Sequence, residues 1–173
     1  MRESTHVVFG LGVAAVVARL LHMPSIDTGL SFAGAILIHE IIDTFGHEQH
    51  FWQSHPRRIK FTHSLFGVIM LSMVLTILIG LPAGLLSGVK HYLIFWPVLA
   101  SGLSHLLLDA LTPQGVYICG KRVTFRVARS SNPLVNTVLQ FAGVALLCYA
   151  FCFLPQPAQP APTQSPPAGS SGG

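Results

Sequence analysis

The fold is decided by the uncharged stretch Ser64–Leu86, SLFGVIMLSMVLTILIGLPAGLL. A helix crosses a hydrocarbon core about 30 Å thick with roughly 20 predominantly apolar residues. Two other long apolar runs, Tyr92–Leu111 and Leu134–Leu154, approach the same length. These segments therefore predict helices that span a membrane.

The composition of the whole chain supports a lipid environment. Of the 173 residues, 51% are hydrophobic and only 9% are charged, whereas a soluble domain carries about 25% charged residues. So little charge cannot cover a surface that faces water, and we expect membrane lipids to surround much of the chain. No basic stripe is interleaved with aromatic side chains, so no nucleic-acid partner is expected.

Two shorter apolar runs, Val7–Leu21 and Gly29–Ile42, come first in the chain. Each is marginal for a full crossing, so they predict either short spanning helices or one re-entrant hairpin buried against the other helices. The predicted fold is an all-α integral membrane bundle of about five helices. The expected helices cover residues 5–21, 29–45, 62–86, 92–111 and 133–154.

The chain divides into a membrane-embedded domain, residues 1–154, and a tail, residues 155–173. The tail is rich in Pro, Ala, Ser and Gly and carries no charge. Such a segment cannot bury enough apolar surface to fold, so we expect it to be disordered.

The distribution of Lys and Arg predicts the orientation in the membrane. Only Arg19 and Lys90 fall toward one face, and the other basic residues fall toward the opposite face: Arg2, Arg57, Arg58, Lys60, Lys121, Arg122, Arg126 and Arg129. Cytoplasmic loops carry the excess of basic residues. The sequence therefore predicts a multi-pass protein of the inner (plasma) membrane, with a cytoplasmic N-terminus and the tail outside.

Under this topology, ionisable residues of several helices gather at the cytoplasmic face. His105 and Asp109 are four residues apart and share a helix face, and His39 and Asp43 repeat this spacing. His47 would extend the second pair if its helix continued. Imidazole and carboxylate groups so placed can bind one divalent cation such as Zn²⁺, or the carboxylate can orient a ligating histidine.

Each histidine also has a purely structural interpretation. Taken alone, His6 and His39 are typical of intramembrane histidines that donate a hydrogen bond to a backbone carbonyl. His22 and His91 fall on the opposite face and are expected at the membrane interface, and His50 is expected in solvent. For His63, His105 and Asp109 the functional interpretation is favoured over the structural one, because a carboxylate within the apolar run Leu106–Leu111 needs a partner.

Three motifs of this chain resemble the YdjM family of inner-membrane proteins, which are described as metal-dependent hydrolases. The motifs are Thr5-His6, Thr62-His63-Ser64 and the run Ser104–Val116, which contains His-x-x-x-Asp-x-x-Thr-Pro-x-Gly-Val. By position, the resemblance implies metal-binding or catalytic roles for His6, His63, His105 and Asp109. The family is distantly similar to zinc-dependent phospholipase C and its related nucleases, which implies zinc and phosphoester hydrolysis.

The chain departs from the family pattern in two places. The family carries a Leu-Pro-Asp-x-Asp-His-like element after its second apolar segment, where this chain has Leu37–Asp43 with Glu40 replacing the first carboxylate. The family also places His-Arg shortly before Thr-His-Ser, where this chain has Arg57–Phe61 and a more distant His55. These departures indicate a changed site or a lost activity.

Two classes of function follow. The first is a metal-dependent hydrolase that acts on a small-molecule or lipid-like phosphoester, with metal ligands His6, His39, His63, His105 and Asp109. In this hypothesis Glu40 or Asp43 is the general base. The second is a non-catalytic scaffold, a regulatory protein or a metal carrier that uses the same ligands. A carrier predicts polar residues throughout the bilayer, and the outer halves of the last three expected helices have almost none.

The predicted orientation can be tested by cysteine labelling of intact cells. A cysteine placed at position 165 should react with a membrane-impermeant reagent from outside, and one placed at position 58 should be protected. The reverse pattern would invert the topology and move the histidines to the other face.

Overall fold

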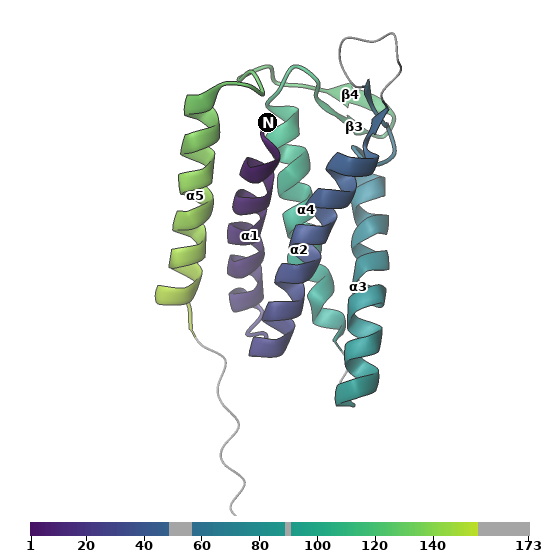
Figure 1. Ribbon diagram of the computed structural model, residues 1–173, viewed down its shortest axis with the longest axis vertical. Helices are drawn as coiled ribbons and strands as arrows, with labels where there is room; N and C mark the ends of the chain where they lie inside the picture. Colours follow the sequence, from purple (N-terminus) through teal and green to yellow (C-terminus); the bar gives the residue numbers. More distant parts are fainter. Residues whose placement is uncertain (49–56, 89–90, 156–173) are drawn as a thin grey trace, which may run out of the picture.

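Helices dominate the computed structural model, which describes residues 1–48, 57–88 and 91–155 (Figure 1). Within these ranges it has five helices that are long and apolar enough to cross a membrane. The predicted all-α membrane bundle is therefore confirmed. The helices are α1 Glu3–Leu20, α2 Ser25–Phe45, α3 Leu65–Ser87, α4 Phe95–Ala110 and α5 Pro133–Cys152.

Short elements connect these helices. A 3₁₀ turn, η1 Tyr92–Ile94, leads directly into α4. Two antiparallel strand pairs lie between helices: β1 His47–Glu48 with β2 Arg57–Arg58, and β3 Val116–Ile118 with β4 Lys121–Val123. The helices run alternately up and down, so the chain begins at one end of the bundle and leaves α5 at the other (Figure 1).

The first two helices are long enough to be spans. At 1.5 Å per residue, the 18 residues of α1 and the 21 residues of α2 give lengths of about 27 and 32 Å. Of the two alternatives that the sequence left open, two short spanning helices fit these lengths better than a re-entrant hairpin.

The limits of α2 differ from those expected. The helix begins at Ser25, directly after Pro24, so Gly29 lies inside it rather than at its start. The helix ends at Phe45 with Gly46 as its C-cap. His47 therefore belongs to β1 and does not extend the helical stripe of His39 and Asp43.

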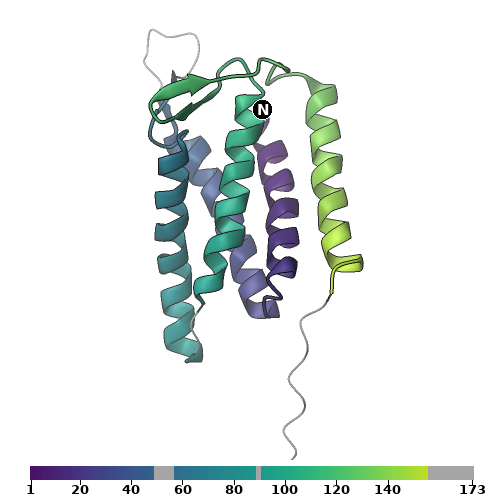
Figure 2. The same ribbon diagram turned by 180° about the vertical axis from the view of Figure 1, so that it is seen from behind.

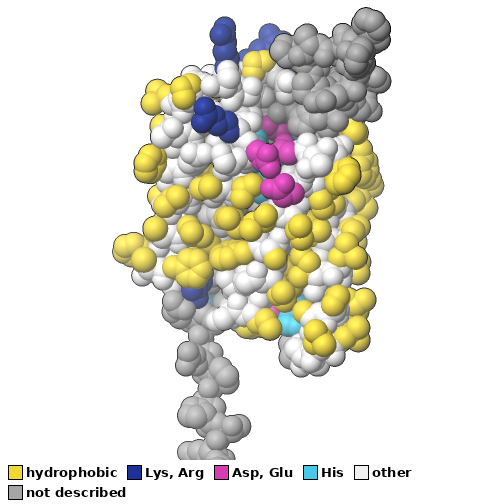
Figure 3. All heavy atoms as spheres, in the orientation of Figure 1, with side chains coloured by type: hydrophobic (Ala, Val, Ile, Leu, Met, Phe, Trp, Pro, Cys, Tyr) yellow, Lys and Arg dark blue, Asp and Glu magenta, His cyan; other side chains and the backbone are white. Residues whose placement is uncertain are grey.

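Helix α1 lies at the centre of the packing and contacts α2, α4 and α5. Small residues allow these close approaches, as is usual between membrane helices. A Cβ atom on Gly12 would lie 2.3 Å from the carbonyl oxygen of Gly143 in α5. In contrast, α3 and α5 turn most of their side chains outward, and hydrophobic side chains cover much of the face in Figure 3. Such a surface is stable in lipid and not in water.

The basic segment between α4 and α5 was expected to be a loop, and part of it forms the β3–β4 hairpin. Cys119 and Gly120 both have positive φ, of 48° and 75°, which is the conformation of a tight two-residue hairpin turn. The segment folds back over the ends of α3 and α4 (Figure 2). Its amide groups donate to carbonyl oxygens at those ends: Tyr117 to His63 at 2.8 Å, Phe125 to Ala110 at 2.8 Å and Val127 to Leu111 at 2.9 Å.

A buried asparagine fixes the start of α5 to the start of α1. The Asn136 side-chain oxygen accepts hydrogen bonds from the Arg2 amide at 3.0 Å and from the Thr5 hydroxyl at 2.9 Å. Its amide nitrogen donates to the carbonyl oxygens of Ser130 and Asn132. Residue 136 is 2% exposed, so water cannot replace these bonds.

We predict that Asn136→Ala destabilises the protein by about 1–3 kcal/mol, because it leaves buried polar groups without partners. Thermal unfolding in detergent measures the effect. Gln140→Ala is the matched control: Gln140 donates to the exposed Ser4 hydroxyl at 3.0 Å and to Thr5 only at 3.4 Å, so its loss should change the midpoint less. Equal midpoints for Asn136→Ala and the wild type would show that the hydrogen bonds of Asn136 contribute nothing to the stability of the fold.

Candidate metal centre

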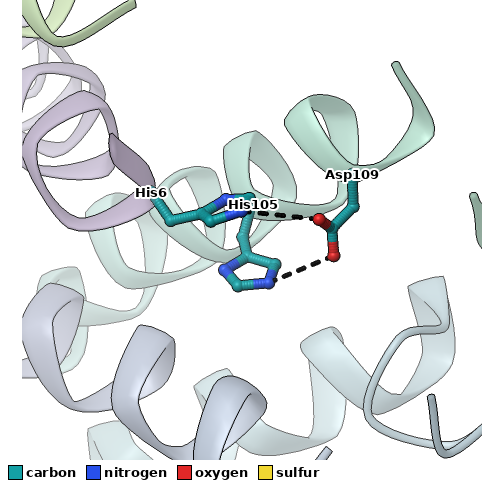
Figure 4. A group of neighbouring side chains, drawn as sticks. All are labelled: His6, His105 and Asp109. Atoms are coloured by element: carbon teal, nitrogen blue, oxygen red, sulfur yellow. Dashed lines mark ion pairs between the residues drawn. The ribbon is translucent and has the colours of Figure 1, made fainter. Parts of the chain in front are cut away.

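Three histidines and one aspartate from different parts of the chain meet at the end of the bundle where the chain begins. His6 comes from the first turns of α1, His63 from just before α3, and His105 and Asp109 from α4. All four are at most 2% exposed. Figure 4 shows the rings of His6 and His105 turned toward the Asp109 carboxylate.

The carboxylate of Asp109 is the common neighbour of the three rings. Its Oδ1 lies 3.4 Å from Nε2 of His6. Its Oδ2 lies 3.3 Å from Nε2 of His105 and 3.6 Å from Nε2 of His63. All three histidines therefore present the same ring nitrogen to one carboxylate.

A second carboxylate reaches the group from α2. Oδ1 of Asp43 lies 3.5 Å from Nε2 of His105. The side chain of Asp43 is 21% exposed, against 1% for that of Asp109. Potential ligand atoms of His6, His105 and Asp109 all lie within 4.8 Å of one another, and so do those of Asp43, His63 and His105. The two sets share His105, so they describe one site with a buried side and a more open side.

The separations of these atoms fit a shared cation better than direct hydrogen bonds. Nitrogen–oxygen hydrogen bonds are usually about 2.7–3.2 Å long, and the four separations here are 3.3–3.6 Å. Ligand atoms placed about 2.0–2.2 Å from a tetrahedral Zn²⁺ are separated by roughly 3.3–3.6 Å. In the described part of the chain, Nε2 of His105 has no hydrogen-bond partner. The residues present therefore fit a divalent cation.

Two residues behind His105 fix the orientation of its ring. Nδ1 of His105 lies 2.9 Å from Nδ1 of His39, and Nε2 of His39 lies 3.0 Å from the Ser101 hydroxyl. If His105 donates from Nδ1, its Nε2 keeps a lone pair directed at the site, which is the tautomer that a metal requires. The sequence predicted His39 as a ligand, and the structure instead places it behind His105 with both ring nitrogens engaged.

Local hydrogen bonds hold His63 and Asp109 in place. Nδ1 of His63 lies 3.2 Å from the Thr62 hydroxyl, and the His63 carbonyl accepts from Tyr117 of the hairpin. The Asp109 carbonyl accepts from the amide and the hydroxyl of Thr112 at 3.0 and 2.8 Å. This explains why the Thr-His and Asp-x-x-Thr elements have their particular spacing.

The structure does not bring Glu40 into this group. Glu40 lines a surface hollow of about 470 Å³ between α1 and α2, together with Glu3, Ser4, Val7 and Val8. Its carboxyl group faces that of Glu3, and acidic side chains are visible together on this face in Figure 3. Of the two expected bases, Asp43 is therefore the one that lies beside the histidines.

The remaining histidines have different positions. His22 is exposed near the opposite end of the bundle, and His50 and His55 lie outside the described residues. His91 is 4% exposed, and its Nδ1 contacts the carboxylate of Asp27. The partner of His91, Asp27, belongs to the first turn of α2, so His91 packs against protein at this end of the bundle.

Sequence reasoning missed two residues that support the site, Ser101 and Gly10. A Cβ atom on Gly10 would lie 2.0 Å from Nε2 of His39 and 2.6 Å from the Ser101 hydroxyl. Only glycine therefore allows α1 to pack against this pair. The signal was spacing: Gly10 is four residues after His6 and Ser101 is four before His105, so each shares a helix face with a predicted ligand.

The fold and this site define a multi-pass helical membrane protein with a buried histidine–carboxylate cluster near one end. The family comparison gives the same answer, because the model of the YdjM inner membrane proteins matches residues 1–155. The chain belongs to the YdjM family, as its motifs indicated. Searches of curated proteins and of solved structures found no similar protein.

We predict that, if this cluster holds a divalent cation, Gly10→Ala weakens that binding by about 10–100-fold, since it displaces the residues that orient His105. Zinc affinity of the purified protein, measured by competition with a chelator, tests this. Gly29→Ala is the control, because a Cβ atom there meets nothing within 4 Å. Equal zinc affinities for Gly10→Ala, Gly29→Ala and the wild type would show that His39 and Ser101 do not support metal binding.

Proposed function

We propose that this inner membrane protein is a metal-dependent hydrolase. The observation that carries the proposal is the set of 3.3–3.6 Å separations around the buried Asp109 carboxylate. An ionised carboxylate is costly in a membrane bundle unless it is paired. The N-terminal ammonium lies 4.0 Å from Oδ1 of Asp109, and a divalent cation held by His6, His105 and Asp109, with His63 and Asp43 beside them, would offset this cost further. Zn²⁺ suits imidazole and carboxylate ligands.

Asp43 is the proposed general base. When bound, the cation lowers the pKa of a coordinated water and polarises the bond to be cleaved. Asp43 adjoins Nε2 of His105 yet keeps 21% of its side chain exposed, so it can accept a proton from water and release it to solvent. Asp109, in contrast, is enclosed by the histidine rings and is suited to binding.

The proposed substrate is a lipid-like or other amphiphilic phosphoester. The site lies near one end of helices whose outer surfaces are hydrophobic, so a substrate can keep its apolar part in lipid while its polar group reaches Asp43. This assignment rests on the position of the site and on the distant relationship of the family to phosphoesterases.

A non-catalytic scaffold is the second candidate. A scaffold would use the same histidines and carboxylates to close a structural zinc with four protein ligands, whereas a catalytic zinc keeps a position for water. The role of Asp43 separates the two candidates, because a scaffold has no use for a general base.

The test compares metal content and hydrolysis in the same variants. Asp43→Asn should keep its metal and lose hydrolysis by about 10²–10⁴-fold, and His105→Ala should lose both. Glu40→Gln examines the other expected base, and Glu3→Gln is the matched carboxylate control. Bound metal is measured by elemental analysis. Hydrolysis is measured with phosphoester and phospholipid substrates, in detergent or liposomes, with added Zn²⁺ or Mn²⁺.

Three results would contradict the proposal. The absence of bound metal in the folded wild-type protein would exclude the metal centre. Loss of hydrolysis in Glu40→Gln, with Asp43→Asn active, would transfer the role of base to Glu40. Stoichiometric metal without turnover on any substrate would favour the scaffold.

A further inference from the structure

A second buried histidine–carboxylate pair lies at the opposite end of the bundle from the metal centre. Nδ1 of His91 contacts Oδ1 of Asp27, and both residues are 4% exposed. His91 precedes η1 and so lies before the start of α4, whereas His105 and Asp109 lie in its second half. Asp27 is in the first turn of α2. The pair therefore joins two helix starts far from the residues of the metal centre.

A serine hydroxyl completes this pair. Oγ of Ser87, the last residue of α3, lies 2.9 Å from Nε2 of His91. The hydroxyl donates to the Ala83 carbonyl oxygen at 2.8 Å, and rotation about its Cβ–Oγ bond would turn the same hydrogen toward Nε2 of His91. A hydrogen on Nδ1 of His91 faces the Asp27 carboxylate, and in the neutral ring this tautomer leaves Nε2 as an acceptor. Ser87 is thus placed to donate to His91.

A carboxylate, an imidazole and a hydroxyl arranged in this order are typical of an activated serine nucleophile. A serine attacks efficiently when an adjacent imidazole takes its proton and a carboxylate holds that imidazole in the correct tautomer. Asp27 and His91 are buried, while Ser87 is exposed. The base is therefore fixed, and the hydroxyl remains accessible to a substrate.

An apolar groove begins beside His91. A hollow of about 420 Å³ is lined by His91 and one side of α3, including Ile77, Leu81, Leu85 and the glycines Gly80, Gly84 and Gly88. A neighbouring hollow of about 390 Å³ shares Thr76, Ile77 and Tyr92 with it and extends to Trp96. Leu81 and Leu85 are 60% and 80% exposed, so this flank faces the lipid. The chemistry that fits such a groove is a fatty acyl chain.

We propose that Ser87, His91 and Asp27 form a metal-independent esterase site for lipid acyl esters. Ser87 Oγ attacks the ester carbonyl carbon while its proton moves to His91 Nε2, and Asp27 stabilises the imidazolium. The C–O bond to the alcohol breaks, and the alcohol takes that proton, which leaves an acyl-serine. Water then attacks the acyl group, passes a proton through His91 to Ser87, and releases the carboxylic acid.

The site is tested with a fluorescent alkyl fluorophosphonate on the full chain in detergent, with a chelator present. Attack by Ser87 would form the O–P bond, release fluoride and pass the serine proton to His91. We expect labelling of the wild type at Ser87, identified by peptide mass spectrometry, and background labelling of Ser87→Ala. Ser25→Ala, an exposed serine at the same end of the bundle, should label like the wild type.

The positioning role of Asp27 is tested by graded substitution. Asp27→Asn should slow labelling by about 10²–10⁴-fold, and Asp27→Glu should restore part of the rate, since it keeps a carboxylate. Long-chain p-nitrophenyl esters should be cleaved at least ten times faster than the acetate ester if the groove holds the acyl chain.

The following outcomes would overturn the proposal. One is a wild-type protein that is monodisperse and helical yet unlabelled by the probe. Another is labelling that Ser87→Ala leaves unchanged. Equal labelling rates for Asp27→Asn and the wild type would exclude the relay. Because chelator is present throughout, these results are independent of the metal centre.

Discussion

The structure of this protein depends on how a carboxylate is accommodated inside a bundle that faces lipid. Asp109 is buried at one end of α4, surrounded by His6, His63 and His105. A charged group in such a place is costly unless it is paired. The positions of α1, of the segment before α3 and of α4 can therefore be understood as bringing three imidazole rings to one carboxylate.

Much of the remaining structure supports this arrangement indirectly, by holding the residues of the cluster in place. The hairpin of β3 and β4 and the residues that follow it donate to the carbonyl oxygens of His63 and Ala110, so this segment holds the end of α4 against the start of α3. Gly10 permits His39 and Ser101 to pack beneath His105. A cluster needs such support, because side chains at a metal centre function only when their neighbours fix their orientation.

The two ends of the bundle have different chemistry. One end combines several imidazoles with two carboxylates at separations that suit a cation, and the other combines one imidazole with a carboxylate and a hydroxyl beside an apolar groove. The apolar helices between them keep the two sets apart. Their different surroundings are the physical basis for proposing two separate activities.

The sequence by itself determined the membrane environment, the helical class and the approximate positions of the helices, because uninterrupted apolar runs of this length have few other stable solutions. It also indicated His63, His105 and Asp109, since ionisable residues stand out against an apolar background. Only the tertiary structure decided that Asp43 joins these residues while Glu40 faces the surface, and that His39 lies behind His105. Likewise, it alone paired Asp27 with His91, which are 64 positions apart. Helical spacing says which residues share a face within one helix, but contacts between helices depend on rotations and close approaches that glycines such as Gly10 permit, and these are set by packing rather than by local pattern.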